Sequence, residues 1–126
     1  MKCLVADDVP ILVRGTKRIA LNVLGEETEI FEAYNSKDVL DIVDKHDLDI
    51  ILLDVEMPTE NGIETAKKIL SEKPDIKIII MSGDSSYKSE ALAAGAHGFI
   101  LKPLFEEDLE QCLKGESMFE WWLNGE

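Results

Sequence analysis

The sequence predicts an α/β fold: a doubly wound, five-stranded parallel sheet of the (βα)5 type with helices on both faces. Short hydrophobic runs alternate with helical patterns, which is typical of parallel sheets. The central run, Ile50–Leu53, has four consecutive branched hydrophobic residues and no polar face, so we expect a strand buried on both sides. The 126 residues include no linker rich in Pro, Gly or Ser, which predicts a single domain over residues 1–126.

The first half of the chain alternates predicted strands and helices. Pro10 suits a first helical turn. The apolar residues Leu12, Ile19 and Val23 then fall at helical spacing and predict the apolar face of this first helix. In order, the predicted elements are a strand at 4–6, a helix from Pro10 to Gly25, a near-edge strand at 28–33, a helix capped by Asn35 or Ser36 and running to about His46, and the central strand at 50–53.

The second half continues the alternation and ends in an amphipathic helix. Pro58 keeps the segment after the central strand as a loop, and Pro74 stops the helix that follows. In order, the predicted elements are a helix from Gly62 to Lys73, a strand at 76–81, a short Ala-rich helix opened by Ser85 or Ser86 and ended by Gly95, a strand at 98–101, and a last helix from about Leu104, with residues 116–126 as its extension or a tail.

Charged and hydroxyl side chains follow four of the five predicted strands. Right-handed crossovers place the carboxyl ends of parallel strands at one edge of the sheet, where open α/β sheets bind ligands. Taken singly, each residue has a simpler explanation, because Asp often caps helices, Ser occurs in turns and Lys lies on surfaces. Their joint appearance favours a site. Its predicted residues are Asp7, Asp8, Asp54, Ser82 and Lys102.

This set predicts magnesium-dependent phosphoryl transfer. Three converging carboxylates repel one another unless a cation joins them, and Mg²⁺ prefers oxygen ligands, with the backbone carbonyl of Glu56 as a further candidate. An ionised Asp54 is then equipped to attack phosphorus. Lys102 would compensate the charge on the phosphoryl oxygens, and the hydroxyl of Ser82 would donate to one of them.

Composition excludes several other functions. The formal net charge of −13 argues against binding to nucleic acid, which depends on clustered Lys and Arg. No apolar run reaches membrane-spanning length, so we expect no membrane insertion. The N-terminus lacks the pattern of a signal peptide, so we expect a cytoplasmic protein. Cys3 and Cys112 lack metal or redox spacing and are predicted to be small buried hydrophobic residues.

Over residues 1–115 the sequence resembles the response-regulator receiver domains of two-component signalling, with the free-standing chemotaxis regulators as the closest type. The matching motifs are the pair Asp7–Asp8, Asp54 at the head of Asp54-Val55-Glu56-Met57-Pro58, Ser82–Gly83 and Lys102–Pro103. The resemblance implies the flavodoxin-like, CheY-like strand order 2-1-3-4-5.

The resemblance also implies a role for each residue. Asp7, Asp54 and the Glu56 carbonyl would bind Mg²⁺, with Asp8 participating directly or through water. Asp54 would accept a phosphoryl group from a histidine kinase, and the Lys102–Pro103 peptide would be cis. Phosphorylation would draw Ser82 inward, and Phe99 would rotate into the vacated space as a packing switch.

Three features depart from the common family pattern. Phe99 stands where the chemotaxis regulator has tyrosine, so ring burial alone would carry the switch. Glu56 and Asp84 occupy positions that tune dephosphorylation, and we hypothesise that Glu56 contacts the metal shell or the apo-state Lys102. The Trp121–Trp122 tail lies beyond the resemblance, and a helix extension, a docking or dimerising surface and a linker stay open.

These residues predict a stand-alone response regulator that signals by binding another protein after Asp54 is phosphorylated. The partner would be a flagellar motor switch component, or a histidine phosphotransfer protein in a phosphorelay. We expect that this protein itself is not an enzyme, except that it would catalyse its own phosphorylation and dephosphorylation. The alternative is a small aspartate-based phosphohydrolase, although that class has a second aspartate two residues after the nucleophile, where this chain has Glu56.

Overall fold

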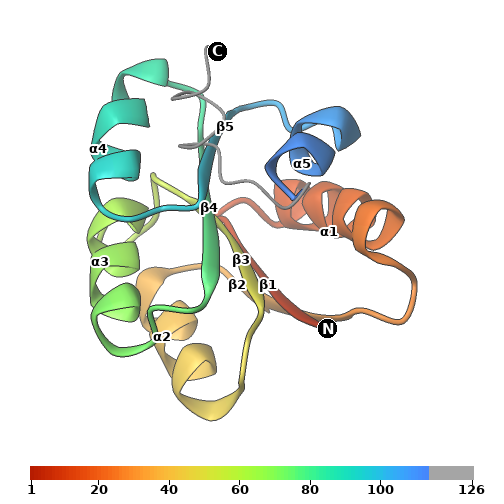
Figure 1. Cartoon of the computed structure of the whole chain (residues 1–126), viewed down its shortest axis with the longest axis horizontal. Coiled ribbons are helices and arrows are strands. Elements are labelled where there is room, and N and C mark those ends of the chain that lie inside the picture. Colours follow the sequence, from red (N-terminus) through yellow and green to blue (C-terminus); the bar gives the residue numbers. More distant parts are fainter. Residues whose placement is uncertain (114–126) are drawn as a thin grey trace.

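A computed structural model describes residues 1–113 of the chain. Its centre is a five-stranded sheet in the order β2-β1-β3-β4-β5, and every neighbouring pair of strands is parallel (Figure 1). This confirms both the fold class and the strand order implied by the family resemblance. The strands are β1 (Lys2–Ala6), β2 (Glu29–Ala33), β3 (Ile50–Asp54), β4 (Lys77–Ser82) and β5 (Gly98–Leu101).

Helices cover both faces of this sheet. Figure 1 shows α1 and α5 on one face and α2, α3 and α4 on the other. The Ala-rich helix begins with a single 3₁₀ turn, η1. The helices are α1 (Pro10–Leu24), α2 (Ser36–Lys45), α3 (Gly62–Glu72), η1 (Ser85–Tyr87) running into α4 (Lys88–Ala93), and α5 (Glu106–Cys112).

Two predictions about the end of the chain meet different outcomes. The last helix begins at Glu106 rather than near Leu104. The reason is local: the carboxylate of Asp108 accepts a hydrogen bond from the backbone N–H of Phe105, which fixes the first turn there. The extension at residues 116–126, including Trp121 and Trp122, lies outside the described residues.

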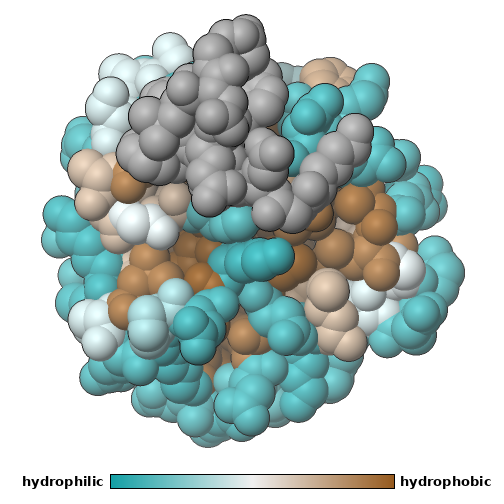
Figure 2. Space-filling model, viewed as in Figure 1, coloured by the Kyte–Doolittle hydropathy of each residue, from teal (hydrophilic) through white to brown (hydrophobic). Residues whose placement is uncertain are grey.

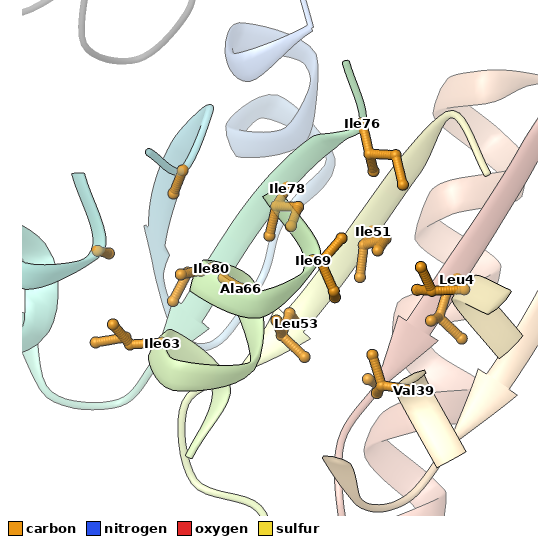
Figure 3. Packing of buried hydrophobic residues seen from close by; sticks show 14 of the residues in the cluster. Leu4, Val39, Ile51, Leu53, Ile63, Ala66, Ile69, Ile76, Ile78 and Ile80 are labelled. Atoms are coloured by element: carbon orange, nitrogen blue, oxygen red, sulfur yellow. The ribbon is translucent and has the colours of Figure 1, made fainter. Parts of the chain in front are cut away.

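The core is divided by the sheet into two hydrophobic layers. Successive residues of a strand point to opposite faces, so Leu53 packs under α3 whereas Leu52 packs toward α1 and α5. Figure 3 shows Ala66 and Ile69 of α3 close to the residues of β3 and β4, and Ile63 belongs to the same hydrophobic layer. Burial of β3 on both faces confirms the interpretation of its unbroken hydrophobic run.

The prediction for the buried face of α1 is wrong in one respect. Leu12 is 44% exposed and the neighbouring Ile11 is 66% exposed. Figure 2 shows hydrophobic surface on the side where α1 lies. The helix is apolar on more than one side, so its spacing does not single out the inner face. The helix buries Val13, Thr16 and Ala20, and the predicted Ile19 and Val23 pack against the same core layer while partly buried.

Helix ends are fixed by asparagine and glycine. Asn35 caps α2 by accepting from the N–H of Asp38 at 2.8 Å, and Asn61 caps α3 by accepting from the N–H of Glu64 at 3.0 Å. Asp54 therefore does not cap the helix that follows it. Gly25 ends α1 with a φ of 112°, a conformation that favours glycine.

The two cysteines and the helix lengths bear on the exclusions made from composition. Cys3 and Cys112 are buried free thiols, as predicted, and burial raises the pKa of Cys3 to about 12 and that of Cys112 to about 11. Within residues 1–113, no helix combines the length and the apolar character needed to cross a membrane.

Candidate functional site

The carboxyl ends of β1, β3, β4 and β5 bring the predicted site residues to one edge of the sheet. Asp54 and Ser82 are the last residues of β3 and β4, and Asp7 and Lys102 directly follow β1 and β5. Because all strand pairs are parallel, these four positions lie at the same edge. The loop after β1 adds Asp8.

Three carboxylates converge at this edge. Oxygen atoms of Asp7, Asp8 and Asp54 lie within 4.8 Å of one another. Asp7 is 1% exposed and Asp54 is 3% exposed, whereas Asp8 is open to solvent. The group therefore has a buried base and an accessible side, as a site for a cation and a phosphodonor from solution requires.

Lys102 is partly buried and forms the base of the site together with two of these carboxylates. Its Nζ lies 2.6 Å from Oδ2 of Asp7 and 2.9 Å from Oδ1 of Asp54, so one ammonium bridges both. Burial disfavours the charge on Lys102, but the hydrogen bonds to Asp7 and Asp54 outweigh burial and raise its pKa. Lys102 is thus a member of the site and not a surface charge. The Lys102–Pro103 peptide is cis, as the resemblance implied.

Asp54 carries the clearest electrostatic signature. Burial raises the pKa of its carboxyl to about 6, and the neighbouring charge of Asp7 adds to the effect, although the hydrogen bond from Lys102 opposes it. At pH 7 this side chain is still mostly ionised. Buried carboxylates whose surroundings raise the pKa toward neutral pH occur frequently at functional sites.

The hydroxyl of Ser82 is held by the loop that follows β4. The side chain is 0% exposed, and its Oγ accepts a hydrogen bond from the backbone N–H of Asp84 at 3.0 Å. Asp84 is itself fixed, because its carboxylate accepts from the N–H of Ser86. Since the Ser82 oxygen already accepts a bond, the hydroxyl proton is left as a donor.

Comparison with known proteins identifies the family. A family model described as "Response regulator receiver domain" matches residues 3–114. The chain belongs to this family. It is the receiver domain of a two-component response regulator, a class that interacts with histidine kinases and typically binds Mg²⁺ at an acidic pocket.

Similar proteins include a transcriptional regulatory protein and solved response-regulator structures. The transcriptional regulatory protein LytR of Staphylococcus aureus is 38% identical over 113 residues, covering 90% of this chain and 46% of LytR. A CheY-like receiver domain protein of Methanospirillum hungatei is 25% identical with a TM-score of 0.79, covering 98% of both chains. TrrA of Thermotoga maritima, solved in complex with Mg²⁺–BeF, is 29% identical with a TM-score of 0.75, covering 90% of this chain and 96% of TrrA.

These relatives limit two of the sequence predictions. The chain spans about half the length of the curated relatives it matches, which are named as transcriptional regulatory proteins. Their names do not single out chemotaxis. Because those relatives are longer, the negative charge argues against nucleic-acid binding by these 126 residues alone.

The structure places the predicted switch residue Phe99 in the core and the side chain of Glu56 in solvent. Phe99 is 3% exposed and packs in the layer that contains α3 and Ala91 of α4, so the ring is part of the hydrophobic core in this structure. The side chain of Glu56 is exposed, and within residues 1–113 no ion pair joins it to Lys102. The expected contact between Glu56 and Lys102 is therefore absent from this structure, and the alternative contact with the metal shell stays a prediction.

The donor set fits a hard divalent cation. All three side chains offer carboxylate oxygens, and Mg²⁺ favours one or two carboxylates with several waters. In this structure Asp7 and Asp54 share the ammonium of Lys102. A bound cation would take over part of the charge compensation that Lys102 provides. Asp7 is further fixed by the N–H of Val9, which donates to its Oδ1 at 3.0 Å.

One residue at the site was missed. The sequence indicates Gly62 only as the start of a predicted helix, but this glycine lies against the backbone of Asp54. Glycine disfavours helices, and Asn61 already caps α3, so the cap does not require Gly62. Glycine at such a position is a signal that another backbone approaches closely.

Proposed function

We propose that this receiver domain accepts a phosphoryl group on Asp54 from a phosphohistidine of a kinase, with Mg²⁺ as cofactor, and signals through altered protein binding. The observation that carries the proposal is the setting of Asp54. Its carboxylate is buried, lies 2.9 Å from Lys102, and shares a 4.8 Å cluster with Asp7 and Asp8. Two buried acids beside a partly buried cation at one sheet edge support this role.

Each residue has a defined task in the transfer. A carboxylate oxygen of Asp54 forms a bond to phosphorus as the bond from phosphorus to the donor nitrogen breaks, so Asp54 must be ionised. Lys102 compensates negative charge on the phosphoryl oxygens, and the proton of Ser82 is available to one of them. Bound Mg²⁺, held by Asp7, Asp54 and the Glu56 carbonyl with help from Asp8, would supply further charge neutralisation and orientation.

The output belongs to the same proposal. We expect Phe99 and Ser82 to repack when Asp54 is modified and thereby to alter the surface formed by α4, β5 and α5. The names of the relatives favour control of transcription, with DNA contacts made by other parts of a longer protein. A stand-alone role in chemotaxis or a phosphorelay, with a motor switch component or a phosphotransfer protein as partner, has no such support from the names of these relatives.

A phosphohydrolase is the alternative from another class. It needs an acid two residues after the nucleophile that can reach the leaving group, and that residue here is the exposed Glu56. We therefore propose that the chain is not an enzyme beyond catalysing its own phosphorylation and dephosphorylation. A cytoplasmic location fits its two buried free thiols.

Acetyl phosphate, a small phosphodonor, tests the proposal. Mass spectrometry of the intact protein should show one added phosphoryl group in the presence of Mg²⁺ and none in EDTA or in Asp54→Asn. Asp75→Asn is a matched control, because Asp75 is an exposed carboxylate that precedes β4, at the opposite edge of the sheet. Modification that is equal in EDTA would refute the mechanism, and many rapid turnovers of the donor would support the hydrolase.

A further inference from the structure

Gly62 opens α3 and lies in direct contact with the backbone of the phosphoacceptor. A Cβ atom added at this position would be 2.2 Å from the carbonyl oxygen of Asp54, 3.0 Å from its carbonyl carbon and 3.1 Å from Cα of Val55. All three neighbours are backbone atoms. They cannot move aside by changing a rotamer, as a flexible side chain could.

The reason for glycine here is space and not backbone conformation. Among the described glycines, the positive φ values belong to Gly25 and Gly95. Gly62 has helical backbone, which alanine adopts more readily. Since real Cβ contacts do not fall below 3.0 Å, any side chain would force α3 and the end of β3 apart by about 0.8 Å or more.

The same contact closes the loop that carries Glu56. The N–H of Gly62 donates to the carbonyl oxygen of Val55 at 2.7 Å. This single hydrogen bond joins the two ends of the loop from 56 to 61. Thr59 in this loop has a φ of 83°, a rare value for a residue with a side chain. The loop is thus a tight closed path, and its shape depends on how near Gly62 lies to Val55.

We propose that Gly62 is a positioning residue for the divalent cation: its missing side chain lets α3 close the 56–61 loop against Asp54 and so fixes the backbone carbonyl of Glu56 toward the acidic cluster. The inference rests on the proposed function, because it takes the cluster as a Mg²⁺ site. It adds that metal affinity depends on a residue with no ligand atom of its own in the site.

The test is Gly62→Ala, with Gly15→Ala as the matched control. Both changes add one methyl group to a helix, but a Cβ at Gly15 meets nothing within 4 Å. Calorimetric titration with Mg²⁺ alone should show an affinity about 10-fold or more weaker for Gly62→Ala, as is typical when a residue that orients a metal ligand is changed. The Mg²⁺ affinity of Gly15→Ala should be unchanged. The Mg²⁺ concentration that gives half-maximal phosphorylation by acetyl phosphate should rise by the same factor.

A purely structural role gives a different result. Gly62→Ala would then lower the urea midpoint but leave the Mg²⁺ affinity of the folded protein unchanged, which would overturn the inference. If Gly62→Ala does not fold, one glycine inserted between Thr59 and Glu60 keeps the Gly62 contact and lengthens the loop. Unchanged Mg²⁺ affinity in that variant also overturns it. Failure of the proposed function is distinct, because the unaltered protein would then bind no Mg²⁺ and acquire no phosphoryl group.

Discussion

Asp54→Asn should stabilise the metal-free protein, although it destroys the reactive group. The surroundings raise the pKa of Asp54 from 3.8 to about 6, which means that folding disfavours its charged form. A shift of about 2 pKa units corresponds to about 3 kcal/mol at neutral pH. Asparagine has nearly the same shape and no charge, so it removes this penalty while Lys102 keeps its ion pair with Asp7.

The sign of the effect follows from proton linkage. The native state holds the Asp54 proton more tightly than the unfolded state, so this group contributes stability below pH 3.8 that is lost as the pH rises through about 6. The advantage of Asp54→Asn should therefore be small near pH 4, grow between pH 4 and 6, and be constant above that. At pH 4.5 it should be about 1 kcal/mol.

Urea unfolding in EDTA measures this difference. With a denaturant slope of about 1–3 kcal/mol per molar, the midpoint of Asp54→Asn at pH 7.5 should lie about 1 M or more above that of the unaltered protein. Asp75→Asn, at an exposed carboxylate, should show no comparable shift. A variant no more stable than the original, or a gap independent of pH, would refute the assignment of Asp54 as a strained buried acid.

Three further predictions concern the site and the core. Lys102→Met should slow phosphorylation by acetyl phosphate by about 10²-fold, but Mg²⁺ should bind at least as tightly because no ammonium competes for Asp7 and Asp54; weaker binding by calorimetry would contradict this. Glu56→Asn should change the half-life of the phosphoprotein, and an unchanged decay by mass spectrometry would rule out a role for this side chain. Ile80→Ala, in the fully buried centre of β4, should lower the free energy of unfolding by about 2–5 kcal/mol in urea titrations, with the Mg²⁺ affinity of the folded protein unaffected.

Most of the fold and the composition of the site could be predicted from the sequence. Continuous apolar runs such as Ile50–Leu53 report burial on both faces of a strand, and parallel strands necessarily end at one edge. Placing Asp54 and Lys102 together therefore needed only the alternation of strands and helices. The strand order needed the family resemblance, because hydrophobic patterns do not say which strands are neighbours.

What the sequence could not supply is contact detail. The apolar residues at the start of α1 occur on several sides of the helix, so only packing reveals that Leu12 is exposed. The burial of Phe99 depends on the space left beside α4. The close approach of Gly62 to Asp54 brings together the backbones of two different elements. The only sign of such a contact in the sequence is the glycine itself, which does not say what lies against it.

The position of Lys102 explains how a receiver domain can fold around two buried carboxylates before any cation arrives. Asp7 and Asp54 carry like charges at close range, and their repulsion disfavours the folded site unless a positive charge lies between them. The ammonium of Lys102 bridges both carboxylates and offsets this repulsion. It is also mobile enough, on a four-carbon chain, to leave Asp7 to a cation and still reach the oxygens around Asp54. A single positive charge can thus stabilise the resting site and remain available when the site becomes more negative, which neither a fixed backbone dipole nor a second buried acid could do.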